Sequence, residues 1–400
     1  MNREIEFAMD LFREYYRRSP PPAPADLRQR EFGFMFFDRD FVRRHMGFLE
    51  ENDYRRFLVN QVPSHAYFSS ALYQRPSAPT MDLKGWTGAD LIFDLDADHI
   101  RGADGLSYQD MLILVKKEAM ALVDRYIFGE FGFDDKYVKI SFSGGRGYHV
   151  HVRDPRVRTL GSHERGEIID FVSGTDLDLD SLFPSSASMK KDFKEKVKVE
   201  RAFRIPRKDE GGWRRFGRGV MEKVAMEVGA MSNAGLRERY PSLQTAKEAT
   251  LDDMRRSLHS RRGESTGLDL MMREDSLEYF TSDRVKELFI QMVLQSLKER
   301  MAGQIDEPVT RDIKRLIRLP GSLHGKTGLK VVTLSRDQMN DFDPLRDAVP
   351  DTYPDRPVKV RLKDNTSIRI RDCQVQGTGD VEVPAYAALF LVLRRMGTLV

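Results

Sequence analysis

The sequence Leu91-Ile92-Phe93-Asp94-Leu95-Asp96-Ala97-Asp98 runs from an apolar segment into acidic residues that alternate with apolar ones. Successive side chains of a β-strand point to opposite faces, so Asp94 and Asp96 would share one face. Two carboxylates held side by side repel each other, and a bound divalent cation such as magnesium or manganese removes that repulsion. The same stretch also fits a strand that runs into an acidic turn, because Asp is common in turns.

A second stretch, Ser143-Gly144-Gly145-Arg146-Gly147, lies between apolar segments at 137–142 and 148–152, which predict the two strands of a hairpin. Glycines let backbone N–H groups approach an anion closely. Arg146 adds a guanidinium that matches phosphate oxygens, the serine adds a hydroxyl, and His149 would point to one face of the second strand. We interpret this stretch as a polyphosphate cradle; the alternative is an ordinary hairpin whose glycines only satisfy the turn.

Residues 306–328 form a third polar stretch. Arg318, His324 and Lys326 are potential donors to phosphate. Asp306 could provide a third carboxylate for a metal pair. The alternative is a solvated basic helix end with favourable charge–dipole interactions, in which Asp306 is an ordinary turn residue.

The composition narrows the class of protein. The 400 residues suggest two or three domain-sized units, or one domain with another inserted. The single cysteine, Cys373, excludes an internal disulfide framework and a cysteine-based zinc site. The N-terminal residues lack the apolar core of a signal peptide, and the longest apolar run, 385–393, is too short to span a bilayer. We therefore expect a cytoplasmic protein without a membrane partner.

Local charge is more informative than the net charge of only +3. Residues 190–218 hold twelve Lys or Arg against five Asp or Glu, with Phe193, Phe203, Trp213 and Phe216 among them. Cations interleaved with aromatic rings suit single-stranded nucleic acid, which offers backbone charge and base stacking. A solvated helix face would show the same composition, so both interpretations stand.

Periodicity and turn residues predict an α/β domain from 1–155 and 300–400, interrupted by a mostly helical insert at 156–299. The expected helices are 1–18, 107–127, 282–300, a short one after 306 that Pro320 ends, and 385–395. The expected strands are 30–37 in a hairpin with 41–45, others within 54–82, the two flanking the glycine turn, 329–334, and a small antiparallel sheet at 355–382.

Three motifs in this order resemble one family: Phe93-Asp94-Leu95-Asp96, Ser143-Gly144-Gly145-Arg146-Gly147-Tyr148-His149, and Pro320-Gly321-Ser322-Leu323-His324-Gly325-Lys326-Thr327-Gly328. Together they are similar to the catalytic small subunit of the archaeal and eukaryotic DNA primase, in its archaeal version. The resemblance implies the primase fold: two packed mixed β-sheets with flanking helices and an inserted, mostly helical subdomain. Arg43 also lies where that family places residues of its active-site side.

The resemblance also implies the chemistry. Asp94, Asp96 and Asp306 would be catalytic and would bind two Mg²⁺ or Mn²⁺ ions. The residues implied to bind the nucleotide are Ser143, Arg146, His149, Arg318, His324, Lys326 and Arg43. The reaction would be template-directed synthesis of short RNA or DNA primers on single-stranded DNA for replication, in which a 3′-hydroxyl attacks the α-phosphate of a nucleoside triphosphate and pyrophosphate leaves.

A large regulatory subunit is the partner that the resemblance implies, in a heterodimer. Many archaeal members carry a cysteine-rich zinc knuckle between the first two motifs, whereas residues 98–137 contain no cysteine here. We therefore expect no zinc in this chain.

Two other classes of protein are compatible with parts of this sequence. The Phe93–Asp96 stretch also resembles the nucleophile strand of haloacid-dehalogenase-like phosphatases, in which Asp94 would attack phosphate covalently, and Ser143 ends a strand as their second motif does. The residue that usually follows the second Asp there, Thr or Val, is absent, and the glycine hairpin is left unexplained. The second class is a non-catalytic protein that binds single-stranded nucleic acid. That interpretation gives no function to Asp94, Asp96 and Asp306.

Overall fold

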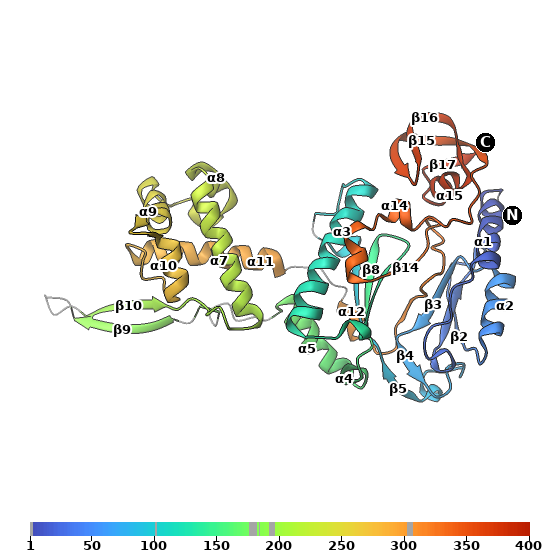
Figure 1. The fold of residues 1–400 in the computed structure, drawn as a ribbon, viewed down its shortest axis with the longest axis horizontal. Helices are drawn as coiled ribbons and strands as arrows, with labels where there is room; N and C mark the ends of the chain where they lie inside the picture. Colours follow the sequence, from blue (N-terminus) through green and yellow to red (C-terminus); the bar gives the residue numbers. More distant parts are fainter. Residues whose placement is uncertain (1–2, 101, 176–181, 184, 192–196, 302–306) are drawn as a thin grey trace. The chain divides into compact units, whose positions relative to one another are not determined.

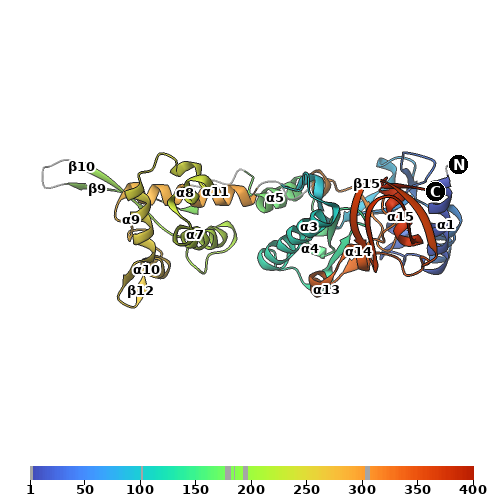
Figure 2. The same ribbon diagram turned by 90° about the horizontal axis from the view of Figure 1, so that it is seen from above.

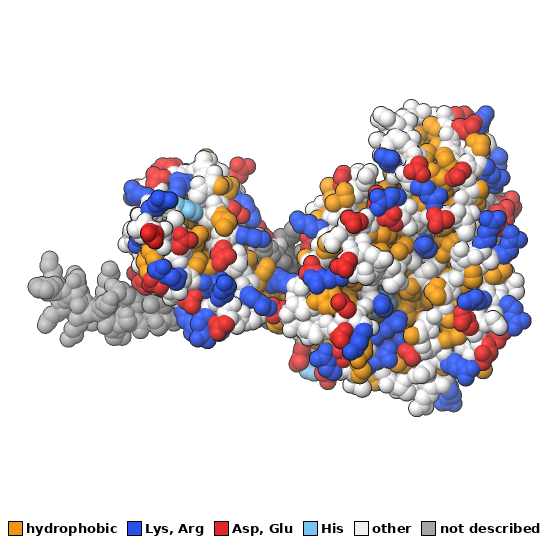
Figure 3. Space-filling view, in the orientation of Figure 1, with side chains coloured by type: hydrophobic (Ala, Val, Ile, Leu, Met, Phe, Trp, Pro, Cys, Tyr) orange, Lys and Arg blue, Asp and Glu red, His pale blue; other side chains and the backbone are white. Residues whose placement is uncertain are grey.

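A computed structural model shows the fold and describes residues 3–100, 102–175, 182–183, 185–191, 197–301 and 307–400 (Figure 1). Contacts within the chain define two compact units, one of Met1–Ile169 with Gly303–Val400 and the other of Asp170–Ala302. On the face shown in Figure 3, positive and negative side chains are interspersed over the surface of each unit. None of the helices in the described part of the chain is long and apolar enough to cross a membrane.

The first sheet of the larger unit has the strand order β13-β3-β1-β2. Its strands are β1 (Phe32–Met35), β2 (Arg43–Met46), β3 (His65–Ser69) and β13 (Leu316–Arg318). The hairpin of β1 and β2 and the strand at His65 confirm the prediction. The expected helix up to Pro320 is wrong, because the helix α12 (Glu307–Arg311) ends early and Leu316–Arg318 pairs with β3 instead.

The second sheet has the order β14-β7-β8-β6 and carries the first two motifs. Its strands are β6 (Leu91–Asp96), β7 (Val138–Phe142), β8 (Gly147–Val152) and β14 (Val332–Leu334). Helix α3 (Tyr108–Leu122), continued by a π-helical segment (Val123–Glu130), connects β6 to β7. The side chain of Ser107 accepts the N–H of Asp110 and caps the start of the helix. The glycine turn then reverses the chain, so that β8 lies between β6 and β7.

Mixed sheets were expected, but every pairing among the described strands is antiparallel. The tight turn after β7 explains this for the second sheet, because β8 inserts between two strands that both run the other way. The two sheets meet through side chains: the ring of Phe68 on β3 stacks on the ring of His151 on β8, with centroids 5.9 Å apart.

Other elements surround these sheets. The amphipathic helix α1 (Arg3–Arg18) confirms the prediction for 1–18 and buries Leu11, Phe12 and Tyr15. Helix α2 (Glu51–Gln61) was missed, because its aromatic residues favoured a strand; Tyr54 and Leu58, one helical turn apart, form its buried side. The remaining elements of this part are β4 (Ala71–Tyr73), β5 (Trp86–Ala89), α4 (Pro155–Arg158), α5 (Ser162–Ser173), α13 (Arg336–Asp341) and α14 (Pro344–Asp347).

The C-terminal residues form a third sheet with the order β16-β15-β17. It consists of β15 (Pro357–Ile370), β16 (Cys373–Pro384) and β17 (Gly397–Leu399), and helix α15 (Ala385–Leu393) packs on it. The predicted antiparallel sheet and final helix are confirmed. Helix α15 also contacts α1, so the two ends of the chain lie close together (Figure 1).

The smaller unit is mostly helical in its described part (Figure 2). Its helices are α7 (Gly212–Ala230), α8 (Asn233–Arg239), α9 (Glu248–His259), α10 (Gly267–Glu274) and α11 (Asp283–Met301). Two hairpins accompany them, β9 (Ser185–Lys191) with β10 (Val197–Phe203), and β11 (Arg261–Arg262) with β12 (Ser265–Thr266). Helix α11 confirms the helix expected at 282–300, and its apolar side chains at helical spacing are buried: Val285, Leu288, Phe289, Met292 and Leu297.

Candidate active site

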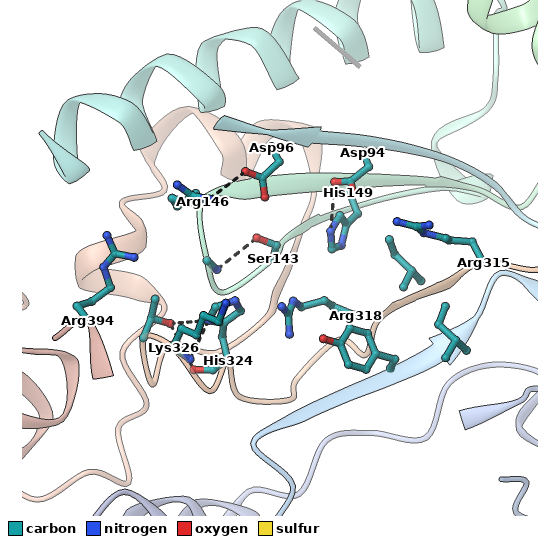
Figure 4. A pocket seen from close by; sticks show the side chains of 15 residues that line it. Asp94, Asp96, Ser143, Arg146, His149, Arg315, Arg318, His324, Lys326 and Arg394 are labelled. Carbon is teal, nitrogen blue, oxygen red and sulfur yellow. Dashed lines mark hydrogen bonds and ion pairs between the residues drawn. The ribbon is translucent and has the colours of Figure 1, made fainter. Parts of the chain in front are cut away.

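The three motifs meet at one cavity of about 450 Å³ in the larger unit (Figure 4). Strand β6 provides two carboxylates, the turn between β7 and β8 provides its glycines, and the segment that includes β13 and the loop after it provides basic groups. The charged side chains that line the cavity are Asp94, Asp96, Arg146, Arg315, Arg318, Lys326 and Arg394. Five positive side chains around two carboxylates favour a ligand with several negative charges.

The two carboxylates share one face of β6, as the alternation of the sequence predicts. Asp94 lies opposite His149 on β8, and Asp96 lies opposite Gly147. Their side chains are 18% and 38% exposed, so both reach the cavity while β6 holds their backbone in the sheet. His149 Nε2 lies 3.4 Å from Asp94 Oδ1.

This pair of carboxylates fits a divalent metal ion. Carboxylate oxygens are the hard ligands that magnesium and manganese prefer, and both side chains open onto a cavity that could also admit water ligands. Asp306, the expected third ligand, lies outside the described residues. Among the residues that the structure describes, there is no group of three or more His, Cys, Asp or Glu side chains placed to hold a metal ion.

The glycine turn is ordered by its own serine. Ser143 Oγ accepts hydrogen bonds from the N–H groups of Gly145 and Gly147, at 3.2 and 3.1 Å. Gly144 has φ of +76°, which favours glycine. A Cβ on Gly145 would lie 2.9 Å from Nε2 of His324, so this glycine also permits the turn to pack on the third motif.

His324 is a neutral hydrogen-bond donor to the cavity. Burial lowers its pKa well below the usual range, and the neighbouring charge of Arg318 lowers it further. Its Nδ1 accepts from the N–H of Lys326 at 3.3 Å, which assigns the proton to Nε2, on the side of Gly145. Thr327 Oγ1 donates to the carbonyl of Gly144 at 2.6 Å and joins the two loops.

His65 holds Arg318 in place, a role that the sequence did not suggest. The Arg318 guanidinium donates to His65 Nδ1 at 2.5 Å, and the N–H of Gly325 donates to the same atom at 3.2 Å. The guanidinium also lies over the ring of Tyr67, 5.0 Å from its centroid. Burial, with the charge of Arg318, lowers the pKa of His65 to about 2, so the ring stays neutral and accepts.

His149 is also neutral. Burial lowers its pKa to about 3, and Arg318 contributes through its charge. Its side chain faces Asp94, and its Nδ1 is buried without a hydrogen-bond partner in the described part of the chain. A neutral ring beside a carboxylate can orient that carboxylate without neutralising its charge.

Arg146 lines the cavity but is bound by acidic side chains. Its guanidinium donates to Asp98 Oδ2 at 2.5 Å and lies 3.8 Å from Asp96 Oδ1. Asp98 is the last residue of the acidic stretch that follows Leu91. Its pairing with Arg146 is a feature that the sequence did not reveal.

Three further side chains of the cavity were missed. The ring of Tyr67 lies under the guanidinium of Arg318. Arg315 lies at one end of the view in Figure 4, and Arg394, which follows helix α15, lies at the other. None belongs to a motif, so no local signal identified them.

Arg43 is not brought to this cavity. It begins β2, at the edge of the first sheet opposite to β13, which carries Arg318. It lines a separate hollow with Phe36 and Gln61. The structure therefore assembles Asp94, Asp96, Ser143, Arg146, His149, Arg318, His324 and Lys326 at one cavity and leaves Arg43 outside it.

Comparison with known proteins identifies relatives along nearly the whole chain. Residues 93–335 match the family model described as DNA primase small subunit. The chain is 40% identical over 388 residues to the DNA primase small subunit PriS of Methanococcoides burtonii, which covers 96% of this chain and 95% of that protein. The PriS of Methanocella arvoryzae is 38% identical over 396 residues, covering 97% and 96%, and that of Picrophilus torridus is 34% identical over 397 residues, covering 98% of both.

Proposed function

This chain belongs to the DNA primase small subunit family, and on that premise we propose how its cavity carries out nucleotidyl transfer. It is the catalytic subunit of a DNA primase, an enzyme of archaeal DNA replication. Members of this family depend on a divalent metal ion. The observation that carries the proposal is the cavity itself, which sets two carboxylates beside five cationic side chains.

The incoming nucleoside triphosphate lies with its α-phosphate near Asp94 and Asp96. These two carboxylates, with Asp306, would hold two magnesium or manganese ions. When bound, such ions lower the pKa of the attacking 3′-hydroxyl and stabilise charge on the leaving oxygen.

The basic side chains bind the triphosphate. Arg318 and Lys326 contribute positive charge, and neutral His324 donates from Nε2. The 3′-oxygen forms a bond to the α-phosphorus while the bond to the bridging oxygen of pyrophosphate breaks. The negative charge that develops on pyrophosphate is then met by donors already in position, which costs little reorganisation.

Arg146 exchanges partners when the nucleotide binds. In this structure it is paired with Asp98. A phosphate offers the guanidinium the same two-pronged acceptor geometry as a carboxylate, so a triphosphate can replace Asp98. The hydroxyl of Ser143 keeps the glycine turn in the shape that presents its N–H groups to the ligand.

We assign the larger unit to catalysis and the smaller one to an inserted helical subdomain. The template is single-stranded DNA, and the partner is a large regulatory subunit in a heterodimer, since the relatives are named small subunits. The basic segment 190–218 would contact the template backbone; within its described side chains, Arg207, Lys208 and Arg215 line a hollow on the smaller unit.

The test is incorporation of labelled nucleotide on a single-stranded DNA template, with magnesium or manganese, with and without the large subunit. We expect short products whose sequence complements the template, with one pyrophosphate released per nucleotide added. Release of phosphate from a monoester, with no incorporation, would instead support the phosphatase that the Phe93–Asp96 stretch also resembles.

A further inference from the structure

We propose that Arg394, at the end of helix α15, binds the terminal phosphate of the incoming nucleotide. This inference rests on the proposed function and adds a residue that no motif contains. The C-terminal sheet and helix would then contribute a side chain that contacts the nucleotide, in addition to packing beside the site.

Arg394 lines the same cavity as the carboxylates. In Figure 4 it lies on the side of Arg146 and Lys326, whereas Arg315 lies at the opposite end of the view. The α-phosphate must lie near Asp94 and Asp96, where it is attacked. If the triphosphate extends from the two carboxylates along the glycine turn, its terminal phosphate lies near Lys326 and Arg394.

Within the part of the chain that the structure describes, the guanidinium of Arg394 has no counter-ion. No carboxylate among the described residues pairs with it, and its Nε is buried without a hydrogen-bond partner there. By contrast, Arg146 in the same cavity is paired with Asp98. A half-buried cation without a counter-ion is costly, and an anionic ligand would offset that cost.

Tyr108, which contacts the glycine turn, holds Arg394 in position. Its guanidinium lies over the ring of Tyr108, 4.6 Å from the centroid. Tyr108 donates from its hydroxyl to the carbonyl of Gly145 at 2.6 Å, and its ring contacts Phe390 of α15 at 5.5 Å. Tyr108 therefore connects α15 to the glycine turn, so the cation is held in position before the ligand arrives.

The experiment compares binding of a nucleoside triphosphate and the matching diphosphate to the full chain, with magnesium and without template, so that no reaction occurs. The wild type should prefer the triphosphate. Arg394→Gln should weaken triphosphate binding by about tenfold or more, the effect of losing a hydrogen bond to a charged group, and leave diphosphate binding within about twofold. Arg394→Lys, which keeps the charge but loses the stacked plane, should retain part of the preference.

Arg395→Gln is the matched control. Arg395 is exposed, adjacent in sequence and not among the residues that line the nucleotide cavity. It should bind both nucleotides as the wild type does.

Three results would overturn the inference. Triphosphate binding by Arg394→Gln that equals the wild type excludes a phosphate contact. An equal loss for both nucleotides with a lower melting temperature indicates a structural role. A wild type that binds neither nucleotide refutes the proposed nucleotide site itself, and this inference with it, whereas a wild type that prefers the triphosphate leaves only Arg394 in question.

Discussion

His65 Nδ1 accepts a hydrogen bond from the guanidinium of Arg318 at 2.5 Å, although the two residues are 253 positions apart in the chain. Strands β3 and β13 pair side by side and bring them together. The same nitrogen accepts the N–H of Gly325, so one ring fixes both Arg318, which we propose binds phosphate, and the loop that carries His324.

Replacing His65 should therefore impair nucleotide binding. We expect His65→Leu to raise the KM for nucleoside triphosphate by about tenfold, because Arg318 loses the acceptor that orients it. His65→Asn keeps an acceptor oxygen near the position of Nδ1 and should retain most of the affinity. Steady-state kinetics of primer synthesis measures both; equal KM values for His65→Leu and the wild type would contradict the positioning role.

Gly145 should not tolerate a side chain. A Cβ there would lie 2.9 Å from Nε2 of His324, so Gly145→Ala forces the turn and the histidine apart. We expect primer synthesis to fall by about tenfold or more while the melting temperature changes little. The control is Gly219→Ala in α7, where a Cβ meets nothing within 4 Å and alanine favours the helix. Full activity of Gly145→Ala would show that the close packing is unnecessary.

The buried neutral histidines predict a loss of stability in acid. Burial lowers the pKa of His149 to about 3, below its ordinary value of 6.5. The unfolded chain therefore takes up a proton at a higher pH than the folded chain does. The stabilising contribution is fully present above pH 6.5 and is lost progressively as the pH falls from 6.5 towards 3.

Denaturant unfolding at a series of pH values between 6.5 and 4.5 tests this prediction. His149→Gln removes the titrating group, so its free energy of unfolding should fall less steeply on acidification, by at most about 1.4 kcal/mol per pH unit. His163→Gln, at an exposed position, is the control and should keep the wild-type slope. Identical slopes for wild type and His149→Gln would mean that His149 does not remain neutral.

The sequence predicted the parts of the site that depend on local spacing. Alternation in Leu91–Asp96 placed Asp94 and Asp96 on one face, and the glycines of 144–147 predicted the hairpin. It did not predict Leu316–Arg318 as a strand, since three residues show no periodicity and their conformation comes from pairing with β3.

The missed residues have a common reason. His65, Arg315 and Arg394 belong to no motif. Pairing of β3 with β13 brings His65 to Arg318, and packing of the C-terminal helix brings Arg394 to the cavity that Arg315 also lines. Arg43 is the opposite case. The family resemblance implied that it binds the nucleotide, but it lies on β2, at the edge of its sheet away from the cavity. Contacts between distant segments decide both outcomes, and local sequence does not encode them.

The central claim is that the carboxylates of β6 carry the metal-dependent chemistry, and single-nucleotide incorporation by Asp94→Asn and Asp96→Asn tests it most directly. Each variant keeps the size of its side chain and removes a charged ligand, so we expect incorporation to fall by at least about a hundredfold with an unchanged circular dichroism spectrum. Asp104→Asn, exposed and outside the cavity, should match the wild type. Near-normal incorporation by either Asp94→Asn or Asp96→Asn would contradict the account.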